Sequence, residues 1–378
     1  MRIGFDVRPF LKEETGVGVY FKNLLFGLSR IDRDNHYYLF SSSWKDRFRR
    51  EKIPPISKLD FRDFRYPVRM INFLWNKAGW PYLDSFFRTD LDLTHSPTPL
   101  ILPTRGKKIV TVYDLFFMDH PHLSDTEARR HFSPKLEESL QRADKIVTIS
   151  RFTKEQILKR FTLDEGKIHV VYLGIDHDVW TDVSAGELEA VKKKYGLPST
   201  FLLFVGAFEP RKNLVRLLEA VKGMHRFYAR IPLVLVGRPG QDYARLLAKI
   251  QELHLEEDVR FLGYLQEPEL RCVYRLAALF VFPSLSEGFG LPLLEAMASG
   301  LPVAASQAPA LPEILQEAAL FFNPHDPEDM TEKITCLLKD EGLRSDLAAR
   351  GLQRVRVFSW NKTAEQTLSL YVNTVDRR

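Results

Sequence analysis

Two glutamates eight residues apart form the most informative chemical pattern in this 378-residue sequence. Glu287 begins a Glu-Gly-Phe-Gly loop, and Glu295 lies inside Leu291–Ser299, which has the pattern of a helix. Carboxylates accept hydrogen bonds from vicinal hydroxyls, so a sugar or ribose ring is a natural ligand. The helix N-terminus would also offer anion-binding backbone amides; the residues there are Gly288, Phe289, Gly290 and Leu291. The alternative is a helix N-terminal acid followed by a solvated glutamate.

Arg211 and Lys212 form an adjacent cationic pair, directly before a helix that Asn213 is suited to cap. The pair follows the apolar run Phe201–Gly206, which places it at the carboxyl end of a predicted strand. Two cations at that place could hold two phosphates. A solvated turn is the alternative, but ligands of α/β sheets bind at this end of the strands, which favours function.

Gly16 and Gly18 follow the first predicted strand and open the first predicted helix. Glycines let the chain turn tightly and bring amides close to a ligand phosphate. A Gly-x-Gly pair also suits an ordinary strand–helix turn. Phe21 stands where a dinucleotide-binding fingerprint would have its third glycine, and no Walker A lysine follows.

Short apolar, β-branched runs alternate with amphipathic stretches through both halves of the chain. Continuous apolar strands indicate burial on both faces, as in a parallel sheet covered by helices. We therefore predict an α/β fold with two Rossmann-like, doubly wound domains that face a central cleft. The predicted strands are Arg2–Val7, Tyr37–Ser42, Asp92–Ser96, Lys108–Tyr113, Lys145–Ile149 and Ile168–Tyr172, then Phe201–Gly206, Pro232–Val236, Val259–Leu262, Leu279–Pro283, Pro302–Ser306 and Ala319–Phe322.

The predicted domains are residues 1–176 and 199–358, joined by a polar linker, 177–198, with one short helix. The tail, 359–378, carries an amphipathic helix whose apolar residues need a surface, and it could pack back on the N-terminal domain. Predicted helices include Thr126–Ala143, Asn213–Arg226, Asp242–Leu253, Leu291–Ser299 and Ser359–Val375.

The net charge of +5 is unevenly distributed, with +8 over residues 1–175 and −3 over the remainder. The excess is concentrated between residues 45 and 88, which indicates an anionic partner. Trp75 and Trp80 lie in this basic segment, so a membrane surface with anionic headgroups or a lipid-pyrophosphate acceptor is one interpretation. An amphipathic helix packed on the sheet, with a solvated outer face, is the other. No nucleic-acid motif accompanies the charge, and nucleic acid is not expected.

Composition restricts the class of protein further. A hydrophobic fraction of 45% and charges without long blocks disfavour disorder. Two cysteines, Cys272 and Cys336, cannot build a disulfide scaffold and suit a reducing compartment. We see no signal-peptide pattern and no apolar stretch of about 18 residues, so we expect a cytoplasmic protein. Peripheral contact with the inner face of the membrane follows if the basic segment binds lipid.

These motifs resemble those of the family 4 glycosyltransferases, the group 1 enzymes with the two-domain GT-B fold, and in style the bacterial mannosyl- and hexosyltransferases. The resemblance covers nearly the whole chain and is looser between residues 43 and 90. It implies a retaining transfer of a hexose, with mannose favoured, from a nucleotide-diphosphate sugar to a saccharide or lipid-linked acceptor in cell-envelope polysaccharide synthesis. It rests on Glu287-x7-Glu295, Glu209-Pro210-Arg211-Lys212-Asn213 and the Gly16-x-Gly18 loop.

The resemblance also implies a role for each matched residue. Arg211 and Lys212 would neutralise the diphosphate leaving group. Glu287 would bind the donor sugar hydroxyls and Glu295 the ribose hydroxyls, with amides around Phe289 and Gly290 holding sugar or phosphate. Gly18 would approach the diphosphate from the other domain. No metal or other cofactor is expected, because the two cations and the amide donors would stabilise the departing charge.

The sequence departs from the family pattern after the fourth predicted strand, where Tyr113-Asp114 replaces the usual His-Asp pair. Asp114 remains a candidate site residue by position. Tyr113 is either a substitute contact or a core aromatic side chain, and it would not share the near-neutral titration of imidazole. His95, at another strand end, is either a cleft residue or a structural histidine.

Two other functions remain open from the sequence. A GT-B epimerase acting on a nucleotide sugar would need acid–base groups whose places the sequence does not reveal. A non-catalytic nucleotide-sugar-binding partner is favoured only by Tyr113. The presence of Arg211, Lys212 and both glutamates argues against that partner, because a protein without turnover need not keep them.

Overall fold

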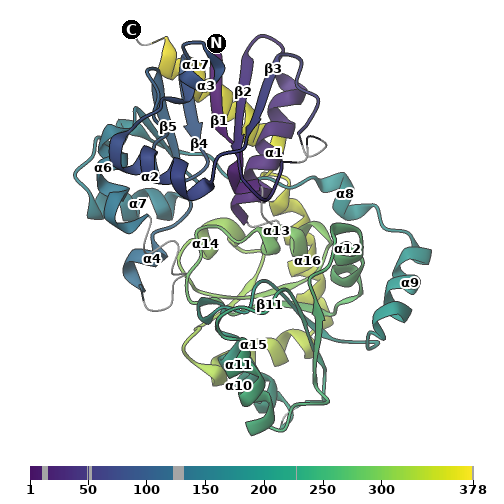
Figure 1. Ribbon diagram of the computed structural model, residues 1–378. Helices are drawn as coiled ribbons and strands as arrows, with labels where there is room; N and C mark the ends of the chain where they lie inside the picture. The colour runs from purple at the N-terminus through teal and green to yellow at the C-terminus, as the bar shows by residue number, and fades with distance from the viewer. Residues whose placement is uncertain (11–15, 49, 51–52, 122–131, 227, 377–378) are drawn as a thin grey trace. The chain divides into compact units, whose positions relative to one another are not determined.

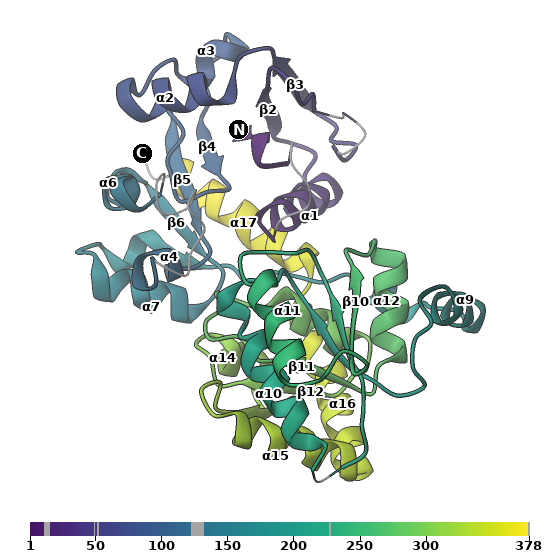
Figure 2. The same cartoon turned by 60° about the horizontal axis from the view of Figure 1, so that its bottom comes forward.

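The chain was analysed as a computed structural model that describes residues 1–10, 16–48, 50, 53–121, 132–226 and 228–376. These residues form two compact units (Figures 1 and 2). Among the described residues, the first unit contains 1–121, 132–174 and 358–376, and the second contains 175–357.

The first unit is built on a parallel sheet whose strand order is β3-β2-β1-β4-β5-β6-β7. The order reverses between β1 and β4, as in a doubly wound fold. The strands are β1 Arg2–Asp6, β2 His36–Ser42, β3 Leu59–Phe64, β4 Leu93–Ser96, β5 Lys107–Val112, β6 Lys145–Thr148 and β7 Ile168–Val170. The sequence did not predict β3, since this edge strand alternates charged and apolar residues and is only half-buried along its length.

Helices surround this sheet, and the helix at the C-terminal end of the chain is one of them. The helices are α1 Gly16–Ile31, α2 Val68–Ala78, α3 Leu83–Phe87, α4 Phe116–Asp119, α6 Leu136–Arg142, α7 Arg151–Arg160 and α17 Trp360–Val375, with short 3-10 turns η1 Arg8–Phe10, η3 Ser133–Lys135 and η4 Glu165–Lys167. The helix predicted over 126–143 is described only from residue 132 onward.

The tail helix α17 lies beside α1 in both views (Figures 1 and 2). A Cβ atom on Gly27 of α1 would lie 2.7 Å from the Ala364 Cβ and 2.9 Å from the Trp360 carbonyl oxygen. Only glycine therefore permits this close approach. The tail thus completes the first unit, although it follows the second unit in the sequence.

The second unit has its own parallel sheet, with strand order β10-β9-β8-β11-β12-β13. Each strand predicted for this half is present, and the prediction of an α/β fold is confirmed. The strands are β8 Leu202–Val205, β9 Leu233–Val236, β10 Val259–Gly263, β11 Leu279–Phe282, β12 Val303–Ser306 and β13 Leu320–Phe322. Four of them, β8, β9, β11 and β12, are buried at every residue, as their predominantly apolar sequences favour.

The helices of the second unit are α8 His177–Thr181, α9 Ala185–Tyr195, α10 Leu214–Met224, α11 Tyr243–Glu252, α12 Glu267–Leu276, α13 Leu291–Ala298, α14 Leu311–Leu315, α15 Pro327–Lys339 and α16 Glu341–Val355, with the 3-10 turn η5 Pro210–Lys212. The segment predicted as a linker with one short helix, 177–198, forms two helices, and both pack on this unit. Trp180 of α8 meets the Tyr274 ring edge-on with centroids 5.5 Å apart. The Tyr195 hydroxyl of α9 donates to Glu269 Oε2 at 2.8 Å.

Candidate active site

The carboxyl ends of β8 and β11 bring the main site candidates of the second unit together. These strands are hydrogen-bonded neighbours at the point where the strand order reverses, which is where open α/β sheets bind ligands. Arg211 and Lys212 follow β8, whereas Glu287 follows β11. The Leu285 amide donates to the Arg211 carbonyl oxygen at 2.8 Å, so the backbone itself joins the two loops.

Glu287 lies between the two cations. Its Oε1 accepts a hydrogen bond from Lys212 Nζ at 2.6 Å, and its Oε2 accepts one from Arg211 Nη1 at 2.8 Å. The side chains of Lys212 and Glu287 are each 8% exposed, while that of Arg211 is 26% exposed. Arg211 also contacts Glu209 through Nε at 3.2 Å. The arrangement therefore leaves Arg211 as the more solvent-accessible cation of the pair.

Charge and burial act against each other at this cluster. Burial by itself would raise the pKa of Glu287, but Arg211 and Lys212 outweigh it and bring that pKa to about 2. Burial, followed by repulsion from Arg211, lowers the pKa of Lys212, and Glu287 offsets part of this change. Lys212 Nζ also lies 4.9 Å from the centroid of the Phe282 ring, which is a favourable cation–π position. Glu287 is thus a carboxylate near neutral pH and cannot act as a proton donor there.

Asn213 holds the cationic loop in place, but not in the way we predicted. It precedes α10 with φ 59°, and its side chain makes no helix-capping hydrogen bond. Its Nδ2 instead donates to the carbonyl oxygens of Pro283 at 3.0 Å and Pro324 at 2.7 Å. Asparagine tolerates this left-handed backbone better than most residues. The side chain thereby joins the loops that follow β8, β11 and β13.

Glu295 lies one turn inside α13, half-buried, and its partner comes from the neighbouring helix α12. The Tyr274 hydroxyl donates to Glu295 Oε2 at 2.8 Å. Burial raises the pKa of Glu295 to about 7, although the hydrogen bond from Tyr274 acts in the opposite direction. Sequence analysis did not find Tyr274, because it lies in an amphipathic helix without any local motif.

The loop between the two glutamates is tightly packed. Gly288 and Phe289 are buried, and Leu291 is half-buried. Gly290 has φ 99°, and a Cβ atom on it would lie 2.8 Å from Leu293 Cδ1. The backbone angle therefore favours glycine at the start of α13, and a larger residue would also displace the end of the Leu293 side chain.

The first-unit candidates lie at different places around their own sheet. Gly16 is the exposed first residue of α1, and Gly18 is buried in the first turn of that helix. Thr15, directly before them, lies outside the described residues. Asp114 follows β5, and its Oδ1 accepts a hydrogen bond from the Phe116 amide at 3.1 Å. These contacts show how the loops are held, and the ligand roles of Gly16, Gly18 and Asp114 stay predictions.

Tyr113 and His95 both make contacts within the first unit. The Tyr113 hydroxyl donates to the Pro97 carbonyl oxygen at 2.9 Å. His95 of β4 is fully buried, with Nδ1 2.6 Å from the Tyr371 hydroxyl and Nε2 2.8 Å from Thr111 Oγ1. Burial lowers the pKa of His95 to about 3, so the ring is neutral near pH 7. The geometry of His95 corresponds to the structural alternative, because both ring nitrogens are engaged by core hydroxyls.

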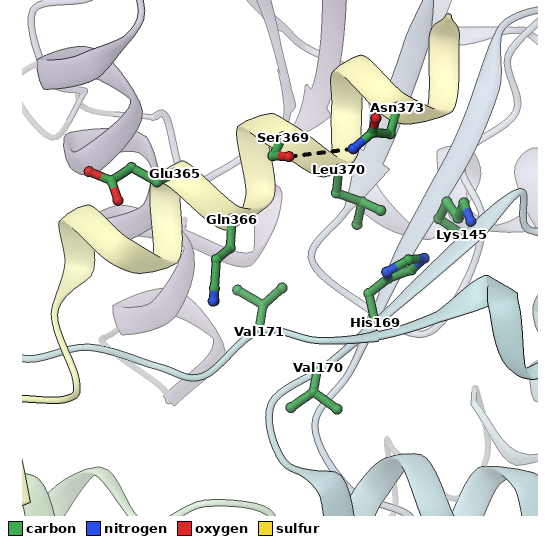
Figure 3. A pocket seen from close by; sticks show the side chains of 9 residues that line it. All are labelled: Lys145, His169, Val170, Val171, Glu365, Gln366, Ser369, Leu370 and Asn373. Atoms are coloured by element: carbon green, nitrogen blue, oxygen red, sulfur yellow. Dashed lines mark hydrogen bonds between the residues drawn. The ribbon is translucent and has the colours of Figure 1, made fainter. Parts of the chain in front are cut away.

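A cavity of about 510 Å³ lies at the β7 edge of the first sheet, beside α17 (Figure 3). Its lining residues are Lys145, His169, Val170, Val171, Glu365, Gln366, Ser369, Leu370 and Asn373. None of the predicted site residues lines it. Elsewhere in the described part of the chain, no group of three or more His, Cys, Asp or Glu side chains is placed to hold a metal ion. Within the same residues, no helix has the length and hydropathy needed to cross a bilayer.

Two doubly wound units, each with a parallel sheet whose strand order reverses once, define the GT-B class of glycosyltransferase fold. Two family models match the chain: Glycosyltransferase Family 4 over residues 15–179 and Glycosyl transferases group 1 over residues 188–354. The chain belongs to this family of glycosyltransferases, as its motifs suggested.

Similar proteins agree with this assignment. The chain is 34% identical over 280 residues to the O-antigen chain mannosyltransferase B of Escherichia coli, covering 73% of each protein. It is 32% identical over 247 residues to the serotype-specific mannosyltransferase WbdA of Escherichia coli, but this match spans only 30% of that longer protein. Among solved structures, it resembles sucrose-phosphate synthase from Thermosynechococcus elongatus with TM-score 0.78, 20% identity and 98% of both chains covered. The glycosyltransferase WaaG of lipopolysaccharide biosynthesis gives TM-score 0.74 at 15% identity, covering 98% of this chain and 99% of its own.

Proposed function

We propose that this protein is a retaining, metal-independent hexosyltransferase that uses a nucleotide-diphosphate sugar, with mannose as the favoured sugar. The acceptor would be a saccharide or a lipid-linked saccharide in cell-envelope polysaccharide synthesis. The observation that carries the proposal is the convergence of Arg211 and Lys212 on Glu287 at the switch point of the second sheet. The O-antigen mannosyltransferases among its relatives support the choice of sugar and acceptor.

The two cations suit the charge that develops during sugar transfer. When the bond between the anomeric carbon and the diphosphate oxygen breaks, its electron pair remains on the diphosphate. Arg211 and Lys212 would stabilise this charge by donating hydrogen bonds to the diphosphate from side chains that the protein already holds in place. They would thereby supply the positive charge that a divalent ion supplies elsewhere, which is why we propose metal-independent transfer.

The two glutamates would both bind hydroxyl groups, but their carboxyl groups differ in pKa. Glu287, with its pKa near 2, remains an acceptor for sugar hydroxyls and keeps Lys212 charged. Glu295, with its pKa near 7, would accept the ribose hydroxyls best in its ionised form. We retain Gly18 and Asp114 as proposed donor-site residues on the family resemblance, and retention of the anomeric configuration rests on the same ground.

A GT-B epimerase is the second candidate, because Glu295 titrates where an acid–base catalyst would. Glu287 does not suit that role, since its low pKa keeps it ionised. A non-catalytic partner would bind nucleotide sugars through the same residues without converting them.

Product analysis separates these functions. The full chain would be incubated with GDP-mannose, UDP-glucose, UDP-galactose and dTDP-glucose, each with envelope oligosaccharide acceptors, in the presence of EDTA. Release of nucleoside diphosphate with an acceptor product of unchanged anomeric configuration, determined by NMR, is the expected result. An inverted product would contradict retention, and activity only after metal is restored would contradict metal independence. A new nucleotide-sugar isomer would identify an epimerase, while binding without any product would identify a partner protein.

A further inference from the structure

Helix α2 exposes apolar and cationic side chains on the same face. Ile71 points inward and is buried, whereas Phe73 is 63% exposed and Met70 is 41% exposed. Arg69, Phe73 and Lys77 follow one another at intervals of four residues, so they line a single side of the helix, away from Ile71. This side therefore presents an aromatic ring between two cations to solvent.

The helix itself is firmly held, so this exposure is a fixed property of the surface. Trp75 lies on the inward side, where its Nε1 donates to the Pro81 carbonyl oxygen at 2.9 Å. The Arg8 guanidinium lies 4.6 Å from the centroid of the Trp75 ring and donates to Asn72 Oδ1 at 2.9 Å. Trp80, directly after the helix, is 60% exposed. Large exposed aromatic residues grouped in this way typically mark an interaction surface.

A basic cavity of about 420 Å³ lies at the C-terminal end of the same helix. Its lining includes four cations, which come from α2, β5, η3 and α6: Lys77, Lys108, Lys135 and Arg142. Among the described lining residues Glu138 is the one carboxylate, and it pairs with Arg142 at 2.8 Å. The cavity thus has an excess of positive charge and fits an anionic group.

Two cations of the remaining basic segment are paired with carboxylates. Arg47 pairs with Asp63 at 2.9 Å, and Arg62 pairs with Asp60 at 3.3 Å. By contrast, the Lys77 side chain makes no hydrogen bond or ion pair with any residue that the structure describes. The Lys77 ammonium is therefore available to an anionic group in the cavity.

The position of the cavity indicates which anionic group would bind. Lys108 lies at the beginning of β5, and Arg142 ends α6, so the cavity lies near the edge where the strands of this sheet begin. Tyr113 and Asp114 lie beyond the other end of β5, roughly 15 Å along the strand. An acceptor pyrophosphate would be required at the carboxyl ends of the strands, where ligands of such sheets react. The cavity is better suited to a headgroup of the bulk lipid.

We propose that this face of the first unit binds an anionic membrane surface, with a lipid phosphate in the cavity and Phe73, Met70 and Trp80 in the interfacial layer. Tryptophan and phenylalanine favour that layer, and lysine and arginine are attracted to the negative surface beneath them. The insertion of apolar side chains and the attraction of cations to anionic lipids both add to the strength of membrane binding. The inference does not depend on the proposed reaction, because binding can be measured without donor or acceptor.

Vesicle flotation with the full chain tests the proposal. We expect binding to phosphatidylcholine vesicles that contain phosphatidylglycerol, little binding to phosphatidylcholine alone, and weaker binding at high salt. The double variant Lys77→Gln/Lys108→Gln should weaken binding roughly 10-fold or more. Phe73→Ser should weaken it several-fold while leaving the salt dependence unchanged. Lys339→Gln on α15 and Val372→Ser on α17 are matched controls at exposed positions and should have no effect.

Three results would overturn the proposal. The first is equal binding to both kinds of vesicle, and the second is unchanged binding by the double variant. The third is binding of inorganic phosphate or pyrophosphate that depends on Lys77 and Lys108 without any binding to vesicles, which would identify a site for a soluble phosphate. Thermal unfolding of each variant verifies that a loss of binding does not reflect a loss of folding.

Discussion

The Tyr274 hydroxyl donates a 2.8 Å hydrogen bond to Glu295 Oε2, which joins α12 to the helix that follows the glycine loop. Burial raises the pKa of Glu295 to about 7, whereas this hydrogen bond acts to lower it. Without the bond, the buried carboxyl would therefore be still harder to ionise. Tyr274 therefore adjusts how readily Glu295 becomes the charged acceptor that a ribose ring requires.

Nucleotide-sugar binding should accordingly strengthen as the pH rises through neutrality. A group with a pKa near 7 is about nine-tenths protonated near pH 6 and about nine-tenths ionised near pH 8, so affinity should rise roughly 10-fold between them. Calorimetry with an intact nucleotide sugar measures this, since its diphosphate diester does not titrate in that range. Glu295→Gln should bind weakly at both pH values, and a wild-type affinity independent of pH would refute the ribose role.

Arg211→Ala and Lys212→Ala should each reduce turnover by roughly 10²-fold or more, because each removes a donor to the leaving-group charge. Steady-state rates of nucleoside diphosphate release measure the effect. Arg350→Ala and Lys339→Ala remove exposed cations of the same kinds from α16 and α15 and serve as controls. Unchanged rates in both site variants would exclude these residues from the reaction.

Glu287→Gln should destabilise the second unit by about 3 kcal/mol, because it leaves Lys212 buried without its counter-charge. The double variant Glu287→Gln/Lys212→Met should recover part of this loss, since it removes the uncompensated charge as well. Urea unfolding of wild type, Glu287→Gln, Lys212→Met and the double variant measures the coupling energy between the two side chains. If the double variant were less stable than the sum of the single changes predicts, the ion pair would not be the source of the effect.

The low pKa of Glu287 also predicts that the free energy of unfolding depends on pH in the acidic range. The folded-state pKa of Glu287 is about 2, below its ordinary value, so the unfolded chain takes up this proton first as the pH falls. Its contribution is complete above about pH 4.5 and is lost progressively toward about pH 2. Denaturant titrations of wild type and Glu287→Gln over this range should converge as the pH decreases, and parallel curves would contradict the assignment.

His95 should stabilise the first unit without any part in nucleotide binding. His95→Gln is expected to cost about 2 kcal/mol, since Tyr371 and Thr111 lose well-placed partners in the core. The folded-state pKa of His95, about 3, is below its ordinary value, so its contribution is present above about pH 6.5 and declines as the pH falls toward 3. Urea unfolding near pH 7 and pH 5 measures both effects, with Tyr371→Phe as a milder control. A loss of nucleotide affinity at unchanged stability would return His95 to the binding site.

The sequence by itself was sufficient for the architecture and for the main loops of the second unit. Burial on both faces favours continuous apolar strands, and this signal is local, so the four fully buried strands of the second sheet were predictable. Arg211 and Glu287 could be placed at one edge because each directly follows such a strand. The edge strand β3 was missed for the converse reason, since half-burial allows charged residues such as Asp60 and Arg62.

Only the tertiary structure decided which side chains meet. His95 and Tyr371 are 276 residues apart, and nothing local to either one indicates the other. Tyr274 reaches Glu295 from a separate helix, so the pKa of that carboxyl could not be inferred from its loop. Local sequence periodicity reports which face of an element is buried, whereas pairing and pKa depend on the atoms that packing places against that face.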